Sequence, residues 1–412
     1  MTPKTIIKLD RYAGIPLCFL LTGFDRIIKL FAGKVSGQYV PEKILFLKLT
    51  EQGASVLAHS AIKRAEGMVG RENVYFCVFR ENRPVLDIMG LVDSANVFEV
   101  SQESLASFCR DMLRFLFKTR KHKIDTVIDM EFFSRASAII SYLSGARVRA
   151  GCHRYSADLP YRGDLMTHKV QYNPYIHVVH QYDLLVQAVT RPLSECPMLK
   201  VTSDEKLPLP TLVKPPEHVF DKVRTTLQKL GVTEGSRIVL LNPNASDMLP
   251  IRKWGTERFI GLARRLLDSD KRLIVLFTGA PSEQPVCESI AASLNSARAV
   301  CLAGHTTLEE LIAVYWIADV LVTNDSGPGH FASLTDIKTV VMFGPETPLL
   351  FGPLGETASV IWKRLACSPC VSAFNHRNTP CEDNVCMKMI TVDEVFDKIS
   401  GIIAAGREKD LA

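Results

Sequence analysis

A run of small and polar residues between two apolar segments contains the side chains best suited to chemistry. Asn324, Asp325 and Ser326 follow the apolar run 319–323, and the glycines at 327 and 329 flank Pro328. Glycine lets a backbone approach a ligand without a Cβ atom in the way, and proline suits the first turn of a helix. N–H groups of such a turn would face an anion, while Asp325 and Ser326 would bind hydroxyl groups. The pattern therefore indicates a sugar-diphosphate site, and its structural alternative is a helix cap between two buried strands.

The same segment and the apolar run after it resemble the signature sequence of glycosyltransferase family 9, the ADP-heptose:lipopolysaccharide heptosyltransferase family. The family pattern D-[ST]-G-P-x-H-x-A stands at 325–332, and F-G-P-T stands at 343–346 with Glu346 in its last place. The resemblance spans residues 43–403 and is strongest in the second half. It implies the GT-B architecture, an α/β fold with two doubly wound Rossmann-like domains facing across a cleft. The first domain would bind the acceptor and the second the nucleotide sugar.

The resemblance implies an inverting glycosyltransferase that moves a heptose or related sugar from an ADP-sugar, or another nucleoside-diphosphate sugar, to a lipopolysaccharide core or similar saccharide. Lys253, which precedes a tryptophan, would hold the diphosphate and assist its departure, so that catalysis would require no metal. Glu283 would bind ribose hydroxyl groups. Plainer alternatives are a solvated lysine and a glutamate that only favours a helix dipole. The residues that the resemblance places at the donor are Ser246, Lys253, Glu283, Asp325, Ser326, Gly327 and His330.

Displacement at a sugar carbon also needs a carboxylate that takes the proton of the acceptor hydroxyl group. In the family, this base is typically an Asp directly after a glycine in the loop that follows the first strand. Here Ala54 follows Gly53, and the nearest carboxylate is Glu51. We therefore take Glu51 as the candidate base, with Asp129 and Glu131 in reserve. A chain without a base would be a catalytically degenerate sugar-nucleotide-binding protein of the same fold.

The segment 147–180 has the composition of an anion-binding face, with five Lys or Arg, four His and two acidic residues. Arginine recognises phosphate and carboxylate groups through paired hydrogen bonds. Arg147, Arg149 and Arg154 are therefore predicted to bind a lipid-linked or lipopolysaccharide-type saccharide acceptor. An ordinary solvated surface explains the composition equally well.

Four of the eleven cysteines follow the spacing C-x2-C-x10-C-x4-C, and these are Cys367, Cys370, Cys381 and Cys386. Four thiolates at this spacing fit a structural zinc or iron–sulfur site, and the alternatives are unligated thiols or a redox pair. The remaining cysteines are scattered through apolar segments and the total is odd, unlike a secreted disulfide framework. This usage favours the cytoplasm.

Apolar runs alternate with helical patterns along the chain, which is typical of βαβ units and a parallel sheet. The proline-rich segment 206–216 predicts a linker between an acceptor domain, 40–205, and a donor domain, 217–390, with a C-terminal helix over 391–412. A nucleotide-sugar epimerase is disfavoured because no G-x-G-x-x-G turn follows Leu49. The predicted strands are 43–49, 74–79, 97–100, 126–130, 237–241, 272–278, 299–302, 319–323 and 339–343.

Residues 1–35 predict an amphipathic segment. The apolar stretch 14–24 is well short of the roughly 20 residues that span a bilayer, and no small-residue cleavage site follows it. From Leu20 onward, apolar residues share one helical face. Such a helix lies either on an anionic membrane, here the inner face of the inner membrane, or against the protein's own surface. The net charge of +5 permits a membrane partner, and the lack of a basic stripe with interleaved aromatics argues against nucleic acid.

Overall fold

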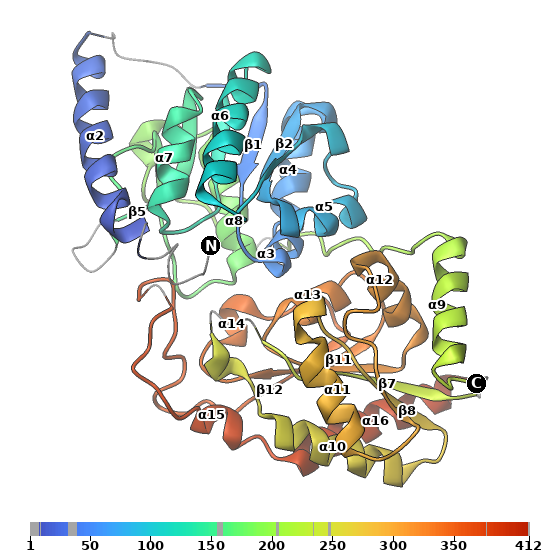
Figure 1. Cartoon of the computed structure of the whole chain (residues 1–412). Coiled ribbons are helices and arrows are strands. Elements are labelled where there is room, and N and C mark those ends of the chain that lie inside the picture. Colours follow the sequence, from blue (N-terminus) through green and yellow to red (C-terminus); the bar gives the residue numbers. More distant parts are fainter. Residues whose placement is uncertain are drawn as a thin grey trace. The chain divides into compact units, whose positions relative to one another are not determined.

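The computed structural model describes residues 8, 10–31, 39–154, 160–202, 206–233, 235–245, 249–375 and 377–410, with side chains up to residue 405. The chain divides into two units, each with its own sheet (Figure 1). Unit 1 comprises Met1–Pro208 and Ala373–His376, and unit 2 comprises Leu209–Ser372 and Arg377–Ala412. The boundary between them falls in the proline-rich segment 206–216.

The described part of unit 1 contains a six-stranded parallel sheet in the order β3-β2-β1-β4-β5-β6. The chain runs outward from β1 to β3, returns to the other side of β1, and continues from β4 to β6. The direction of winding therefore changes between β1 and β4, as in doubly wound folds. The strands are β1 (Ile44–Leu47), β2 (Val74–Phe79), β3 (Val97–Val100), β4 (Thr126–Asp129), β5 (Val148–His153) and β6 (His168–Gln171).

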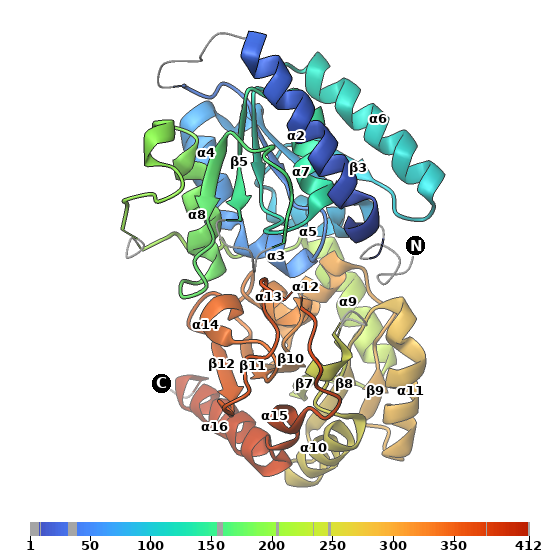
Figure 2. The same cartoon turned by 90° about the vertical axis from the view of Figure 1, so that its left-hand side faces the viewer.

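Helices cover both faces of this sheet, which is why its central strands are apolar on both sides. Helices α2, α7 and α6 lie on one face, while α4 and α8 pack together on the other (Figures 1 and 2). The helices of unit 1 are α2 (Gly14–Phe31), α3 (Gln52–Leu57), α4 (His59–Val69), α5 (Arg83–Met89), α6 (Leu105–Lys121), α7 (Arg135–Leu143) and α8 (Val178–Ala188).

Unit 2 repeats this plan over its described residues, with a parallel sheet in the order β12-β11-β10-β7-β8-β9. Trp254, Phe259 and Phe277 are fully buried in its core. The winding direction changes between β7 and β10. The strands are β7 (Arg237–Asn242), β8 (Leu273–Phe277), β9 (Ala299–Cys301), β10 (Val320–Asn324), β11 (Lys338–Phe343) and β12 (Ala358–Trp362).

The helices of unit 2 surround this sheet (Figure 2). They are α9 (Glu217–Lys229), α10 (Thr256–Ser269), α11 (Gln284–Ser293), α12 (Leu308–Ile317), α13 (Gly327–Ala332), α14 (Pro348–Phe351), α15 (Val385–Lys388) and α16 (Val392–Asp410).

The predicted α/β class with two doubly wound Rossmann-like units is confirmed. Each apolar run predicted as a strand is a strand, whereas β5, β6 and β12 were not predicted. Helix α2 begins at Gly14, earlier than the periodicity from Leu20 indicated. No helix within the described ranges is both long enough and apolar enough to cross a membrane.

A buried ion pair connects three segments of unit 1. The Asp129 carboxylate, at the end of β4, accepts hydrogen bonds from Arg162, from Ser137 Oγ (2.9 Å) and from the Glu131 N–H group (3.0 Å). Arg162 also donates to the Cys152 carbonyl oxygen (3.0 Å). Burial raises the pKa of Asp129 to about 6, although the Arg162 charge favours the ionised form. The pair therefore fixes the geometry where β4, α7 and the segment around Arg162 meet.

Asp129→Asn should lower the free energy of unfolding by about 3–5 kcal/mol, because it leaves the Arg162 guanidinium buried without its counter-charge. Chemical denaturation measures this loss. The matched control is Asp93→Asn, which breaks the exposed pair with Arg71 and should cost under about 1 kcal/mol. Equal losses for the two variants would contradict a special role for the buried pair.

Candidate active site

The predicted donor residues of unit 2 follow the carboxyl ends of neighbouring strands. Lys253 comes after β7 and Glu283 after β8, while Asp325 comes directly after β10. These strands are adjacent in the order β10-β7-β8, and the winding direction changes between β10 and β7. Ligands of doubly wound sheets bind outside the carboxyl ends of strands at such a point. Ser246 lies outside the described residues.

The buried side chain of Asn324 connects two of these loops. Its Oδ1 atom accepts a hydrogen bond from the Trp254 N–H group (3.0 Å), and its Nδ2 atom donates to the carbonyl oxygens of residues 243 and 244 (3.1 and 3.0 Å). Asn384 donates to the Lys253 carbonyl oxygen (2.9 Å). The backbone at Lys253 is thus fixed from two sides, by the end of β10 and by the cysteine-bearing segment.

Asp325 and Glu346 form a buried carboxyl pair beside Arg252. Asp325 is 4% exposed and Glu346 is 2% exposed. Arg252 Nη1 lies 3.6 Å from Asp325 Oδ2 and 3.7 Å from Glu346 Oε2, and Arg377 Nε lies 3.4 Å from Glu346 Oε1. Neither Arg252 nor Glu346 was among the predicted site residues.

The two carboxyl groups are hydrogen-bonded to each other and share a proton at neutral pH. Burial, reinforced by the Asp325 charge, raises the pKa of Glu346 to about 8, and Arg252 opposes this shift. Burial also raises the pKa of Asp325, again against Arg252. A proton on the pair and the guanidinium groups of Arg252 and Arg377 therefore compensate the negative charge at the end of β10.

Three polar atoms of this group make no hydrogen bond within the described structure: Arg252 Nε, Asp325 Oδ2 and Glu346 Oε1. Buried polar atoms without partners are uncommon in folded proteins and call for an explanation. Hydroxyl groups of a sugar both donate and accept hydrogen bonds, so they match this set of atoms. The sequence carried one signal for Glu346, namely its departure from the last position of F-G-P-T.

The turn after β10 uses its small residues for packing. Ser326 Oγ lies within hydrogen-bond distance of Thr323 Oγ1 and of the Asn324 carbonyl oxygen (3.1 Å each), so its hydroxyl group supports the turn. A Cβ atom on Gly329 would lie 3.3 Å from Val341 Cγ2, which shows how closely α13 packs on β11. Gly327 begins α13, and His330 lies half-buried within it.

Glu283 caps the turn that contains it. Its Oε2 atom accepts a hydrogen bond from the Ala280 N–H group (2.7 Å), three residues earlier. A Cβ atom on Gly279 would lie 2.9 Å from the same oxygen, so glycine lets the carboxylate approach this closely. The contact is the local role that a glutamate in a first turn commonly has, and ribose binding stays a prediction.

In unit 1, Glu51 stands out among the candidate bases. It precedes α3 with φ 68° and ψ 94°, a conformation that non-glycine residues rarely adopt and that often marks a functional site. The buried Lys48 Nζ lies 3.4 Å from Glu51 Oε2 and 3.1 Å from Glu131 Oε2. Glu131 also accepts from the N–H groups of residues 49 and 50 (2.9 Å each). Of the three carboxylates, Glu51 is the most exposed, Glu131 is less exposed and Asp129 is fully buried.

The three arginines predicted to bind the acceptor do not converge. Arg149 is buried in β5, where it donates to the carbonyl oxygens of Leu165 (2.8 Å) and Ala146 (2.6 Å), so its role is structural. Arg147 precedes β5, and Arg154 follows it. A strand of this length separates the two by about 20 Å. The unpredicted strand β5 therefore separates Arg147 from Arg154, which the composition of the segment had grouped into one binding face.

The four spaced cysteines lie in the segment that follows β12. Cys370 N–H donates to the Pro345 carbonyl oxygen (3.0 Å), and Cys381 Sγ donates to the Asp383 carbonyl oxygen (3.1 Å). Cys386 is buried and Cys367 is exposed. Within the described ranges, no three His, Cys, Asp or Glu side chains are arranged to hold a metal. A zinc or iron–sulfur site here stays a prediction from spacing.

Glu346→Gln should flatten the pH dependence of stability. With its pKa raised from 4.5 to about 8, Glu346 keeps a proton in the folded chain that the unfolded chain releases. Rising pH across this window therefore favours unfolding, by at most about 1.4 kcal/mol per pH unit for one proton. Glutamine imitates the protonated form and removes this slope. Denaturation curves across the window measure it, with the exposed Glu309→Gln as control, and equal slopes in wild type and Glu346→Gln would refute the shared proton.

Comparisons with known proteins agree with this architecture. Residues 112–379, more than half of the chain, match the model of glycosyltransferase family 9 (heptosyltransferase). Lipooligosaccharide heptosyltransferase 2 of Campylobacter jejuni subsp. jejuni serotype O:6 is 30% identical over 173 residues, which cover 41% of this chain and 52% of that protein. The lipooligosaccharide heptosyltransferase 2 of Haemophilus ducreyi is 24% identical over 77% of this chain and 88% of its own length.

The fold is also shared with solved structures. The structure of E. coli ADP-heptose lps heptosyltransferase II has a TM-score of 0.65 at 19% identity, covering 89% of this chain and 99% of that one. A glycosyl transferase family 9 structure from Veillonella parvula has a TM-score of 0.69 at 15% identity, covering 90% and 100%. The match to the Campylobacter relative spans about half of that protein's length. Because the family model covers most of the chain, including β10, β11 and the buried carboxyl pair, this protein belongs to glycosyltransferase family 9.

Proposed function

We propose that this protein transfers a heptose or related sugar from an ADP-sugar to a lipopolysaccharide-type saccharide, with inversion at the transferred carbon. The observation that carries the proposal is the group of Asp325, Glu346 and Arg252 at the switch point of unit 2, with Lys253 next to it. Family membership supports the reaction class. The curated relatives are heptosyltransferases, and a similar solved structure is of an ADP-heptose enzyme.

Each group has a distinct role in the proposed displacement. Glu51 takes the proton of the acceptor hydroxyl group while the acceptor oxygen bonds to the sugar carbon. The bond from that carbon to the diphosphate oxygen breaks, and the nucleoside diphosphate leaves with the electron pair. Lys253 stabilises the developing charge, so that we propose a transfer without a metal. Asp325 and Glu346 bind sugar hydroxyl groups, because Asp325 Oδ2 and Glu346 Oε1 are buried and make no hydrogen bond within the described structure.

The acceptor is proposed to be a saccharide attached to lipid, with the reaction at the inner face of the inner membrane. The names of the curated relatives support a lipooligosaccharide or lipopolysaccharide acceptor. Arg147 and Arg154 remain the candidate acceptor-binding arginines, whereas the buried Arg149 is no longer one.

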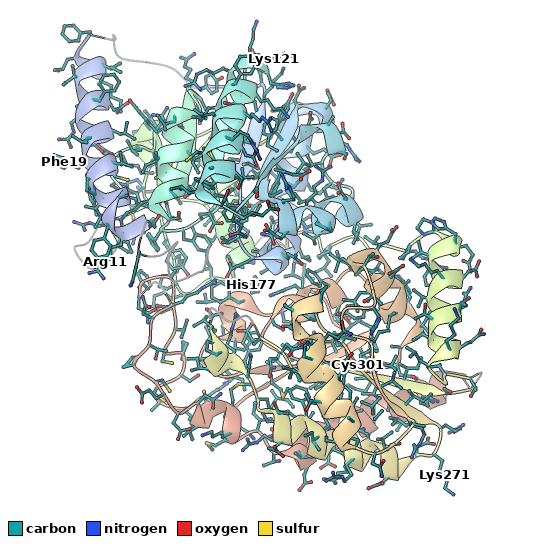
Figure 3. The ribbon with its side chains drawn as sticks, viewed as in Figure 1. Arg11, Phe19, Lys121, His177, Lys271 and Cys301 are labelled. Carbon is teal, nitrogen blue, oxygen red and sulfur yellow. The ribbon has the colours of Figure 1, made fainter. Side chains whose placement is uncertain are left out.

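Lys253→Ala should weaken the binding of ADP and of an ADP-sugar by about 10- to 100-fold, because a hydrogen bond to a charged group is worth about 1.5–3 kcal/mol. Titration calorimetry against ADP, UDP, GDP and CDP measures this loss and the nucleotide preference. Lys271→Ala is the matched control, since Lys271 is an exposed lysine in the turn before β8 (Figure 3). It lies at the amino end of that strand, whereas the candidate site lies at the carboxyl ends. Unchanged affinity in Lys253→Ala would remove this lysine from the donor site.

Glu51→Gln should reduce turnover by roughly 10²–10⁴-fold and leave the dissociation constant of the donor unchanged, because only proton transfer is lost. Steady-state kinetics and calorimetry on the same preparation separate the two effects. Glu66→Gln, on the surface of α4 where it pairs with Lys63, is the control. Wild-type turnover in Glu51→Gln would exclude Glu51 as the base. A wild type that binds donor tightly but transfers nothing would instead favour the degenerate sugar-nucleotide-binding protein.

A further inference from the structure

Helix α2 presents its large apolar side chains outward and its small and polar side chains inward, the reverse of an ordinary surface helix. Its buried residues are small or polar: Gly14, Cys18, Thr22 and Asp25. Its large apolar side chains point outward, and Phe19 extends away from unit 1 in Figure 3. Outward residues recur at three- and four-residue spacing, so they share one face. Their exposed fractions are 70% for Phe19, 65% for Leu20, 57% for Phe24, 56% for Ile27 and 87% for Phe31.

Specific polar contacts fix this orientation. Thr22 Oγ1 donates to the Cys18 carbonyl oxygen (2.7 Å) and accepts from the Asp164 N–H group (2.8 Å). Gly163 has a positive φ of 71°, and a Cβ atom there would lie 2.7 Å from Thr22 Oγ1. Unit 1 therefore holds α2 by these polar contacts together with the packing of Cys18 on Leu165 and Met166, and a rotation that buried the outward apolar side would break both.

Asp25 strengthens the same attachment. It is buried, pairs with Lys29 (2.5 Å) and is hydrogen-bonded to Tyr142 of α7. Its charge also acts on the buried Arg149 of β5. A carboxylate that interacts with residues of the sheet and of α7 marks this side of α2 as the inner one.

The outward face is large and continuous. Helix α2 has 18 residues and is about 27 Å long. Exposed apolar patches of this kind mark surfaces that bind a protein or a membrane. Isolated apolar residues on a surface need no explanation, but a whole helical face of Phe, Leu and Ile does.

Basic side chains border this face. The exposed Arg26 lines a cavity of about 260 Å³ beside α2, together with His153, Arg154 and Lys169. The one acidic residue among the lining residues, Asp164, is paired with Lys169. On the same face of the sheet, α6 exposes Leu113 and Phe117 among further basic residues: Arg110, Arg114, Lys118 and Lys121 (Figures 2 and 3).

We propose that the outward face of α2 docks this protein on an anionic lipid bilayer. The helix lies in the interface with Phe19, Phe24 and Ile27 among the acyl chains, and Arg26 contacts lipid phosphate groups. Apolar residues on one helical face flanked by cations are the combination that such a surface binds. A second copy of the chain is a poorer occupant, because a two-fold contact would place the basic residues opposite each other.

The test is flotation of the full chain with phosphatidylcholine vesicles, with and without phosphatidylglycerol. The wild type should float with the anionic vesicles, and Phe24→Asp with Ile27→Asp should lower the partition coefficient by roughly tenfold or more. Arg26→Glu should weaken binding to the anionic vesicles alone. Leu193→Asp, at a similarly exposed apolar residue outside α2, is the matched control and should float as the wild type does.

The same measurements distinguish docking on a bilayer from dimerisation and from misfolding of the variants. All substituted residues are exposed, so unchanged thermal unfolding curves show that the variants fold. Wild type that stays out of both vesicle types would overturn the proposal. The proposal would also be overturned if the wild type sedimented as a dimer that the α2 variants dissociate, while no variant changed flotation. Vesicle binding does not depend on donor or turnover, so its result stands apart from that of the proposed transfer.

Discussion

The guanidinium of Arg252, placed between two buried carboxyl groups, is the interaction on which the candidate site of unit 2 depends. Burial and the neighbouring Asp325 charge raise the pKa of Glu346 despite the nearby Arg252, so this second carboxyl group keeps a proton near neutral pH. Arg377, from the cysteine-bearing segment, stands on the other side of Glu346. Asn384 of the same segment fixes the backbone at Ile251 and Lys253 (2.8 and 2.9 Å). The geometry around Asp325 therefore requires that residues distant in sequence fold back onto the ends of the central strands.

Unit 1 places buried charge at the corresponding part of its own sheet. Lys48, at the end of β1, lies between Glu51 and Glu131, and Asp129 at the end of β4 pairs with Arg162. In both units the charges lie where the direction of winding changes. Buried ion pairs contribute little net stability, since desolvation offsets much of their attraction. Their position at the strand ends is better explained by the groups that they orient, in unit 1 the carboxylate of Glu51.

How much the sequence alone predicts depends on whether a signal is local. Long apolar runs such as 74–79 and 339–343 are strands because a parallel sheet buries both faces. The strands β5 and β6 were missed because Arg149, His168 and Lys169 interrupt their apolar character. The burial of Arg149 depends on carbonyl groups at 146 and 165, and no local pattern predicts which carbonyls a guanidinium will reach. Glu346 could be predicted only in part, because the sequence shows its departure from the F-G-P-T motif but not its contact with Asp325.

Helix α2 shows the same distinction in one element. Periodicity predicts that its apolar and polar residues separate onto two faces, but which face lies inward depends on the surface that receives the helix. That surface offers the Asp164 N–H group, Tyr142, Arg149 and the backbone at Gly163, and these groups match Thr22 and Asp25. Hydrogen bonds and the close packing of small residues, including Cys18 in an apolar cluster with Leu165 and Met166, therefore determine the orientation. Removal of the apolar face from water is consequently not yet achieved in the folded chain. The free energy that it releases stabilises the complex with the surface that covers this face.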